Sequence, residues 1–337
     1  MKAEPNELQR AILPTTEAGV PRLKDVVISR RSRVITWFLR QIMPRYLRWM
    51  LNGSNKRIAR AQLLVASQTC KDSSGFAIDY DVIGAPDGGV AGHVVGALDQ
   101  PGKTMLLWLH GGAFVLPAAP DMQVRLVARL CRELDAVGFV PDYRLAPFNR
   151  FPAALDDCER AYKAVLDLGF APSRIVLAGE SAGGNLVLGL LQRIRKRGWP
   201  MPACAMPVSP ATALGRIHAP PSRTLRMKTD PILPIVELQR VDELYAGGHD
   251  ASDPELSPLY ADCRGFPPMY LLASDSEVLL DDTVLFARRA KAAGVDVRFE
   301  IWPVLPHAFP LFAAIFPEVR QSIADMVSFA QAHLAKG

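Results

Sequence analysis

Residues 174–185 constrain the fold of this chain more than any other stretch. Residues 175–178 are a short aliphatic run typical of a buried strand, and the pattern becomes helical over residues 182–197. Between these two segments stands Ser181, with a glycine two residues to either side, in the pattern G-x-S-x-G. A sharp strand-to-helix turn of this kind holds the serine hydroxyl at the carboxyl edge of a sheet, beside the N–H groups that begin a helix. We therefore predict that Ser181 is a nucleophile. So short a motif also arises by chance, and the prediction needs support from the rest of the chain.

The remaining chain alternates between strand-like and helix-like segments. Short apolar or β-branched runs predict strands, and longer amphipathic runs predict helices. The predicted strands span residues 77–83, 92–97, 105–109, 137–140, 203–208, 269–273 and 297–302, and the predicted helices span residues 121–134, 153–168, 235–245, 279–293 and 318–335. This alternation predicts an α/β fold, with a mostly parallel central sheet covered by helices on both faces.

Two segments do not follow the alternation, and we interpret them as a helical cap. Residues 1–60 form an N-terminal segment, and its amphipathic run over residues 27–51 predicts two helices separated at Pro44. Residues 211–257 are rich in proline and lie between two predicted strands. They are expected to be a second cap segment, inserted into a catalytic domain that spans residues 61–337.

The N-terminal segment is strongly basic. Residues 1–60 contain 13 Lys/Arg and 4 Asp/Glu, a net charge of +9, whereas the whole chain carries +5, which leaves −4 for the remainder. A basic amphipathic helix can bind acidic lipid or nucleic acid, but no nucleic-acid motif accompanies this charge. The apolar stripe of the run consists of Ile35, Phe38, Leu39, Ile42 and Met43. Any helix packed on a protein shows such a stripe, so packing against the main domain is expected rather than membrane contact.

Cysteine usage and the first residues indicate a cytoplasmic protein. The five cysteines are an odd number, lie far apart and include no C-x-x-C pair, which argues against a disulfide framework. Glu4 and Glu7 stand where a secretory signal would need an apolar core. The longest uncharged stretch, residues 104–120, is broken by glycines and a proline, so it does not predict a membrane span. The six histidines form no metal-ligand pattern, and no metal is expected.

Acyl transfer at a serine requires a base, an acid that orients this base, and donors for the oxyanion. His110, Gly111 and Gly112 directly follow the predicted strand at residues 105–109. Consecutive glycines let the backbone approach a ligand and turn its N–H groups toward it. Together with the N–H of Ala182, these glycines would form an oxyanion hole.

The candidate base lies near the C-terminus. His307 follows the last predicted strand and is preceded by Pro306 and followed by Pro310, which suggests a fixed loop that holds the imidazole in place. The sequence over residues 143–147 and 151–157 is interpreted as a loop that caps the helix beginning at Ala153, with a structural role only.

Taken together and in this order, the motifs resemble the hormone-sensitive lipase family of α/β-hydrolase carboxylesterases, family IV of the bacterial esterases. H-G-G-x, Y-R-L-A-P, F-P-A-A, G-x-S-A-G-G and a late H-x-F occur in family order over residues 105–309. The resemblance implies an α/β-hydrolase fold with a helical cap, Ser181 as nucleophile and His307 as general base. The family's H-G-G-G is H-G-G-A here. The implied oxyanion hole consists of Gly111, Gly112, Ala113 and Ala182.

A further family motif implies the acid. Many members carry D-P-L-R-D, in which the first aspartate is the acid and a second acidic residue follows four positions later. In this chain Glu277 stands four residues before Asp281, whereas Asp275 stands six before it. The register favours Glu277, with Asp275 as the alternative, because a carboxylate of either length can orient an imidazole.

The resemblance implies hydrolysis of small to medium, uncharged carboxylic esters through an acyl-enzyme, with no metal or organic cofactor. The same triad could also cleave amides or lactones. The fold also serves as a small-molecule receptor that has lost catalysis, but the presence of Ser181 and His307 argues against that interpretation. The expected partner is a small-molecule ester and not a nucleic acid, and an exposed edge strand could support a homodimer.

Overall fold

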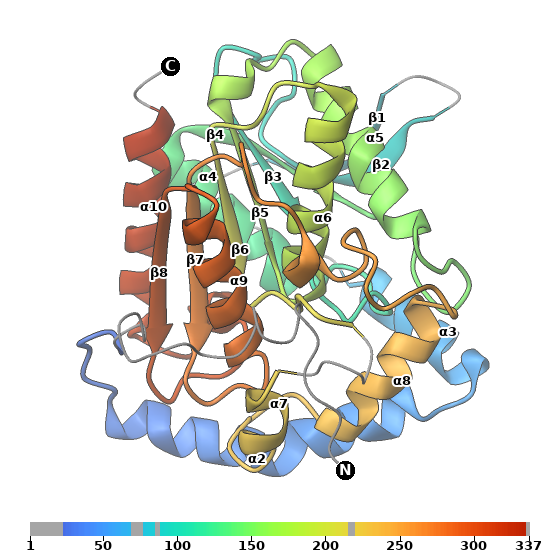
Figure 1. The fold of residues 1–337 in the computed structure, drawn as a ribbon, viewed down its shortest axis with the longest axis vertical. Helices are drawn as coiled ribbons and strands as arrows, with labels where there is room; N and C mark the ends of the chain where they lie inside the picture. Colours follow the sequence, from blue (N-terminus) through green and yellow to red (C-terminus); the bar gives the residue numbers. More distant parts are fainter. Residues whose placement is uncertain (1–22, 69–76, 85–87, 215–219, 335–337) are drawn as a thin grey trace.

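A single mixed sheet forms the centre of the molecule (Figure 1). The computed structural model describes residues 23–68, 77–84, 88–214 and 220–334. The strands within these ranges are β1 Ile78–Ile83, β2 Val90–Val95, β3 Thr104–Leu109, β4 Ala136–Pro141, β5 Ile175–Glu180, β6 Cys204–Val208, β7 Met269–Ser274 and β8 Val297–Trp302. Their order is β1-β2-β4-β3-β5-β6-β7-β8. The pairs β1–β2 and β2–β4 are antiparallel, and all pairs from β4 to β8 are parallel.

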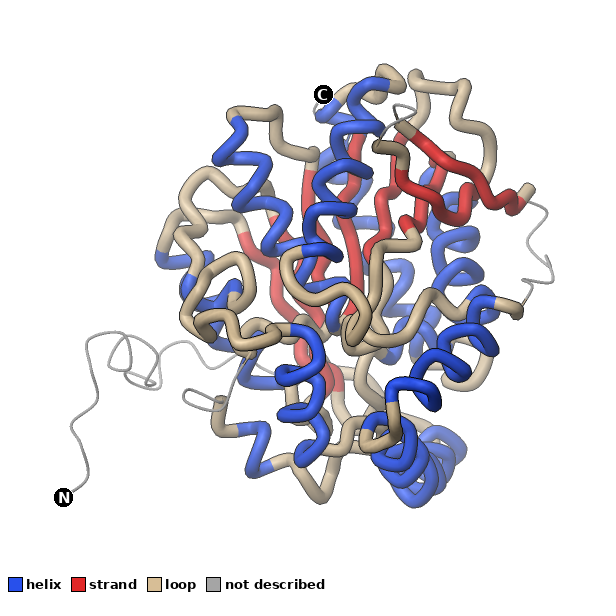
Figure 2. The backbone as a smooth tube through the Cα atoms, turned by 90° about the vertical axis from the view of Figure 1, so that its right-hand side faces the viewer, coloured by secondary structure: helices blue, strands red, loops and turns tan. Residues whose placement is uncertain are grey.

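Helices cover both faces of this twisted sheet (Figure 2). The helices are α2 Arg30–Leu51, α3 Asn55–Ala66, α4 Arg125–Leu134, α5 Ala153–Asp167, α6 Ala182–Arg197, α7 Ser222–Leu225, α8 Ile235–Tyr245, α9 Leu280–Ala292 and α10 Val319–Leu334. Helices α4 and α10 pack on one face, and α5, α6 and α9 pack on the other. The fold class predicted from the sequence, an α/β-hydrolase fold, is confirmed.

The central strands are buried on both faces, which explains their uninterrupted apolar sequences. In β3, Leu106 and Trp108 belong to the core beneath α4 and α10. The alternate residues Met105, Leu107 and Leu109 belong to the core beneath α5 and α6. Successive side chains of a strand point to opposite faces, so a strand covered on both sides needs an apolar residue at every position.

The N-terminal helices differ from their prediction. Helix α2 is a single helix with Pro44 inside it, so the predicted break is wrong. Helix α2 continues through the proline, although Pro44 removes a backbone hydrogen bond, and it contacts α3 and α8. Helix α3 was not predicted from the sequence, and a domain boundary at residue 60 would cut through it.

The helices of the expected cap lie at one end of the molecule. Figure 1 shows α2, α7 and α8 at the lower end, toward which the arrowheads of β7 and β8 point. Because α2 contacts α8, the N-terminal segment and the inserted segment meet there. Across the described residues, no helix combines the length and the apolar character that crossing a membrane requires.

Candidate active site

The turn between β5 and α6 places Ser181 in a strained backbone conformation. Its φ of 57° and ψ of −117° lie outside the regions that residues with a side chain usually occupy. The flanking glycines are required by close packing: a Cβ on Gly183 would lie 1.8 Å from the carbonyl oxygen of Leu109, and one on Gly179 would lie 2.4 Å from it. The sequence therefore folds into the sharp strand-to-helix turn that was predicted.

A carboxylate holds the imidazole of His307. The Nδ1 atom of His307 lies 2.5 Å from Oε2 of Glu277, and both side chains are buried. The other carboxylate oxygen of Glu277 accepts the backbone N–H of Ser274 at 2.9 Å, which fixes its orientation. Within the described part of the chain, Nε2 of His307 has no hydrogen-bond partner.

Asp275 has a different position from Glu277. Its carboxylate accepts the N–H of Val304 at 2.7 Å and the hydroxyl of Ser276 at 3.1 Å. These bonds tie it to the start of the loop that carries His307, rather than to the imidazole. Of the two candidate acids, the structure therefore brings Glu277 to the histidine.

The environment of His307 changes its basicity. Burial lowers the pKa of the imidazole, but the hydrogen bond and charge of Glu277, together with the charges of Asp230 and Glu180, outweigh burial and raise it above its ordinary 6.5. An imidazole whose charged form is stabilised in this way accepts a proton readily.

Hydrogen bonds to the last residue of β6 and to the residue after it connect the serine and the histidine loop. The N–H of Ser181 bonds to the carbonyl of Val208 at 2.9 Å. The next residue, Ser209, accepts the N–H of Ala308 through its hydroxyl at 3.3 Å. Ser181 and His307 thus lie at the same edge of the sheet, although their side chains share no hydrogen bond. In unliganded active sites such bonds are often long.

One of the predicted oxyanion donors faces elsewhere. The N–H of Gly111 bonds to Oε1 of Glu180 at 2.5 Å, so it is not free to bind an oxyanion. Gly112, with φ of 124°, and Ala113, with φ of 57°, turn the chain after it. Ala113 and Ala182 both line the cavity that contains Ser181.

Glu180 ties two parts of the site together. Besides Gly111, its carboxylate accepts the indole N–H of Trp108 at 2.7 Å and the amide of Gln123 at 3.1 Å. Burial raises the pKa of Glu180 to about 7, and these donors partly counteract the effect of burial. Sequence reasoning did not identify this role, because Glu180 occupies the variable position of G-x-S-x-G and its partners are distant in sequence.

The residues around His110 fix the glycine loop. The imidazole of His110 stacks on the ring of Tyr143, with centroids 4.1 Å apart, and the Tyr143 hydroxyl donates to the His110 carbonyl at 2.6 Å. Burial lowers the pKa of His110 to about 4, so the ring is neutral at physiological pH. The amide of Gln62 in α3 also bonds to the Val115 carbonyl at 2.7 Å. The Y-R-L-A-P segment therefore supports the active-site loop as well as the helix that follows it.

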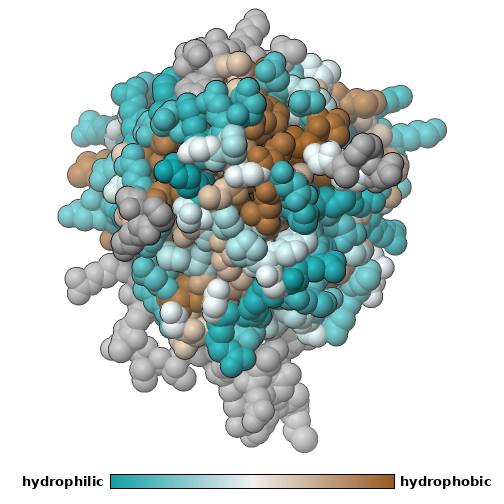
Figure 3. All heavy atoms as spheres, turned by 90° about the horizontal axis from the view of Figure 1, so that it is seen from above, coloured by the Kyte–Doolittle hydropathy of each residue, from teal (hydrophilic) through white to brown (hydrophobic). Residues whose placement is uncertain are grey.

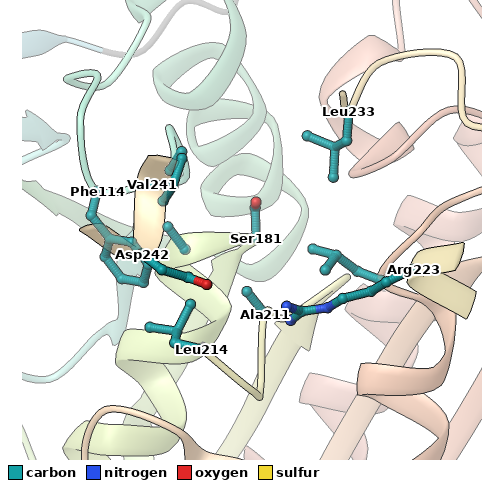
Figure 4. A pocket seen from close by; sticks show the side chains of 11 residues that line it. Phe114, Ser181, Ala211, Leu214, Arg223, Leu233, Val241 and Asp242 are labelled. Atoms are coloured by element: carbon teal, nitrogen blue, oxygen red, sulfur yellow. The ribbon is translucent and has the colours of Figure 1, made fainter. Parts of the chain in front are cut away.

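A small cavity opens beside Ser181 (Figure 4). Its wall is mainly apolar, with Phe114, Leu214, Leu233, Val241 and Leu279, and it also includes Arg223 and Asp242. The guanidinium of Arg223 makes a two-point ion pair with Asp282, through Nη2 at 2.7 Å and Nε at 3.1 Å. Because Asp282 balances this charge, the cavity favours uncharged groups.

The wall that contains Arg223 is fastened to the start of α9. The N–H of Ser222 bonds to the carboxylate of Asp281 at 2.7 Å, and the N–H of Asp281 bonds back to the Ser222 hydroxyl at 2.9 Å. Nearby, Asp230 accepts the N–H of Val278, the residue after Glu277, at 2.8 Å. No sequence pattern marks these contacts, because the partners lie about 50 to 60 residues apart.

Known proteins are similar to this chain in sequence and in architecture. A family model described as alpha/beta hydrolase fold matches residues 106–311. An acetyl-hydrolase of Streptomyces hygroscopicus is 34% identical over 76% of this chain and 86% of its own length. The esterase LipU of Mycobacterium tuberculosis is 37% identical over 66% of this chain and 76% of its own.

Solved structures agree with these relatives. The crystal structure of EstE5 soaked with ethyl alcohol superposes with a TM-score of 0.80 at 30% identity, covering 91% of this chain and 99% of EstE5. A bacterial hormone-sensitive lipase family esterase gives a TM-score of 0.76 at 31% identity, over 92% and 100% of the two chains. This chain therefore belongs to the hormone-sensitive lipase family of α/β-hydrolase esterases.

Proposed function

We propose that this protein hydrolyses carboxylic esters with small to medium, uncharged acyl groups, using Ser181 as nucleophile, His307 as general base and Glu277 as the acid. The contact of 2.5 Å between Glu277 and Nδ1 of His307 carries the proposal. This contact leaves Nε2 directed away from the acid and available to the serine hydroxyl, which is the division of roles that a serine triad requires.

Acylation begins when Oγ of Ser181 attacks the ester carbonyl carbon and Nε2 of His307 takes the hydroxyl proton. The carbonyl oxygen becomes an anion and accepts hydrogen bonds from the N–H groups of Gly112, Ala113 and Ala182. The N–H of Gly111 remains bonded to Glu180. When the tetrahedral intermediate collapses, the alcohol oxygen leaves with the proton from Nε2. Each oxyanion donor contributes about two to three orders of magnitude to the rate.

Deacylation repeats these steps with water. Nε2 of His307 takes a proton from the water as its oxygen attacks the acyl carbon, and the same amides hold the second oxyanion. The bond to Oγ of Ser181 then breaks, and Oγ recovers its proton from Nε2. Throughout, Glu277 keeps the proton of the imidazole on Nδ1 and stabilises the imidazolium.

The cavity supports the substrate class. The cavity beside Ser181 is small, and its apolar wall suits a short alkyl chain. Among the relatives, one is an acetyl-hydrolase, and crystals of EstE5 were soaked with p-nitrophenyl butyrate. Both support short acyl groups.

The test is a series of p-nitrophenyl esters of increasing acyl length, assayed beside matched amides and lactones with the wild type and Ser181→Ala. We expect highest kcat/KM for short acyl esters and a loss of about 10⁶-fold in Ser181→Ala. A serine-directed phosphonate should label the wild type and leave the variant unlabelled. Unchanged turnover in Ser181→Ala would refute the mechanism, and faster turnover of amides or lactones than of esters would refute the substrate class.

A further inference from the structure

Helix α2 packs Ile35, Leu39 and Leu47 against the domain but leaves a second set of large apolar side chains exposed to solvent. Ser32 and Thr36 are buried, whereas Trp37 and Phe38 are 53% and 54% exposed. We call the exposed set of α2 the outward stripe; it consists of Val34, Trp37, Phe38, Ile42, Tyr46 and Trp49. A helix that only packs on a domain buries its large apolar residues. The expectation that Phe38 and Ile42 pack against the main domain is therefore wrong.

The outward stripe is continuous along the helix. Val34, Phe38 and Ile42 are spaced by four residues and Trp49 by seven more, which places them on one side of α2. Trp37 lies edge-on to Phe38, with ring centroids 4.9 Å apart. On α3, which contacts α2, Leu63 and Leu64 are also exposed.

The charged side chains of α2 and α3 themselves are all basic. Helices α2 and α3 contain nine Arg and Lys residues and no Asp or Glu. Arg57 of α3 lies over the ring of Trp49, with its guanidinium carbon 4.6 Å from the ring centroid. Arginines beside tryptophan, tyrosine and aliphatic side chains are typical of a helix that lies in the headgroup region of an anionic membrane.

Other occupants fit this surface less well. The charge would also attract a nucleic acid, but its phosphates would offer no apolar surface for Phe38 and Ile42. A second copy would match the apolar stripe, but it would bring two sets of arginines together and their charges would repel. An anionic lipid surface satisfies both the apolar and the basic side chains.

We propose that the outward stripe docks this enzyme on an anionic lipid surface, with α2 lying in the plane of the headgroups. Helix α2 lies at the same end of the molecule as the cap helices α7 and α8 (Figure 1). The opposite end, seen in Figure 3, has mostly hydrophilic side chains around a hydrophobic area. Docking therefore turns the cap and the carboxyl edge of the sheet, where Ser181 lies, toward the lipid.

The first test is co-sedimentation of the full chain with vesicles. We expect binding to phosphatidylcholine vesicles that contain roughly 30% phosphatidylglycerol, and little binding to phosphatidylcholine alone, because each basic residue gains from the negative surface potential. Binding should weaken as salt screens this potential. No binding to the anionic vesicles at low salt would overturn the proposal.

Matched variants identify the surface. Ile42→Ser removes an apolar residue of the stripe that is 61% exposed, and Val82→Ser removes one on β1 that is 60% exposed. Arg31→Glu and Arg320→Glu reverse the charge at the second residue of α2 and of α10. We expect each α2 variant to weaken partitioning about tenfold and each control to leave it unchanged. All four should hydrolyse a soluble short-chain ester as the wild type does, since none lines the cavity.

Three results would contradict the proposal. An equal loss of vesicle binding in a variant and its control would mean that the stripe is not the docking surface. A dimer that Ile42→Ser dissociates, in a protein that does not bind vesicles, would assign the stripe to a second copy. Binding to duplex DNA without binding to vesicles would assign the basic side chains to nucleic acid.

Discussion

At the scale of single residues, two neighbouring carboxylates differ in whether they contact the imidazole of His307. Glu277 bonds to Nδ1 of His307, while Asp275 bonds to the N–H of Val304. Both are acidic residues in the same loop after β7, so the sequence alone offered two candidates. Their hydrogen bonds lead to opposite expectations for their amide variants.

Glu277→Gln is expected to reduce kcat by about 10³- to 10⁴-fold, because the amide no longer stabilises the imidazolium. The contact with Glu277 raises the pKa of His307, and the base acts in its neutral form. Without the charge of Glu277 this pKa falls, so the rise of kcat/KM with pH should move to lower pH. Asp275→Asn, the matched control, should keep the rate within about threefold and the profile unchanged. The reverse pattern in the two variants would make Asp275 the acid.

Sequence reasoning placed Ser181 and His307 because each stands in a recognisable motif at the end of a predicted strand. It did not find Glu180, which bonds to Gly111, Trp108 and Gln123. These partners lie 57 to 72 residues away along the chain, and only the folded structure brings them together. For the same reason the Gly111 amide was assigned to the oxyanion hole, although Glu180 binds it.

At the scale of elements, the sequence predicts those whose side chains face a core. The bounds of α6, α8 and β8 agree with the prediction at both ends. Helix α3 was missed because it buries only Ile58, so its sequence lacks a strong inward stripe. Helix α7 was missed because its four residues are too few to show a period.

The turn between β5 and α6 has no room for a larger residue. Gly183→Ala would place a Cβ 1.8 Å from the Leu109 carbonyl oxygen, and the strand and helix would have to separate. We expect destabilisation of about 3 kcal/mol or more, measured by urea unfolding. Gly102→Ala is the control, since a Cβ there meets nothing within 4 Å. Equal stability of the two variants would show that the turn does not need this glycine.

At the scale of the whole molecule, periodicity predicts that a helix is amphipathic but not which side meets the protein. Of the stripe predicted for α2, Ile35 and Leu39 pack against the core as expected, whereas Phe38 and Ile42 face solvent. The contacts between the cap and the catalytic domain could not be predicted from the sequence either, because Arg223 and Asp282 are 59 residues apart.

The ion pair between Arg223 and Asp282 is expected to hold the cap on the catalytic domain. Both side chains are buried, so Asp282→Asn leaves the guanidinium without a counter-charge, and we expect a loss of about 3–5 kcal/mol in the free energy of unfolding. Asp262→Asn breaks a pair with Arg264, whose side chain is 79% exposed, and should change stability by less than about 1 kcal/mol. Urea unfolding of both variants measures the difference. If Asp282→Asn lost as little unfolding free energy as the control, the ion pair would not hold the cap on the catalytic domain.

The carboxylate of Glu180 has a consequence for how the site behaves when its surroundings move. Glu180 is the last residue of β5, directly before Ser181, and it accepts a hydrogen bond from Gly111, at the start of the loop that leads to Gly112 and Ala113. The attacking oxygen and the proposed oxyanion amides therefore share one rigid frame. We therefore expect the distance between the Ser181 hydroxyl and these amides to change little when the cap is displaced. Selection can reshape the cap for new substrates without readjusting the chemistry beneath it.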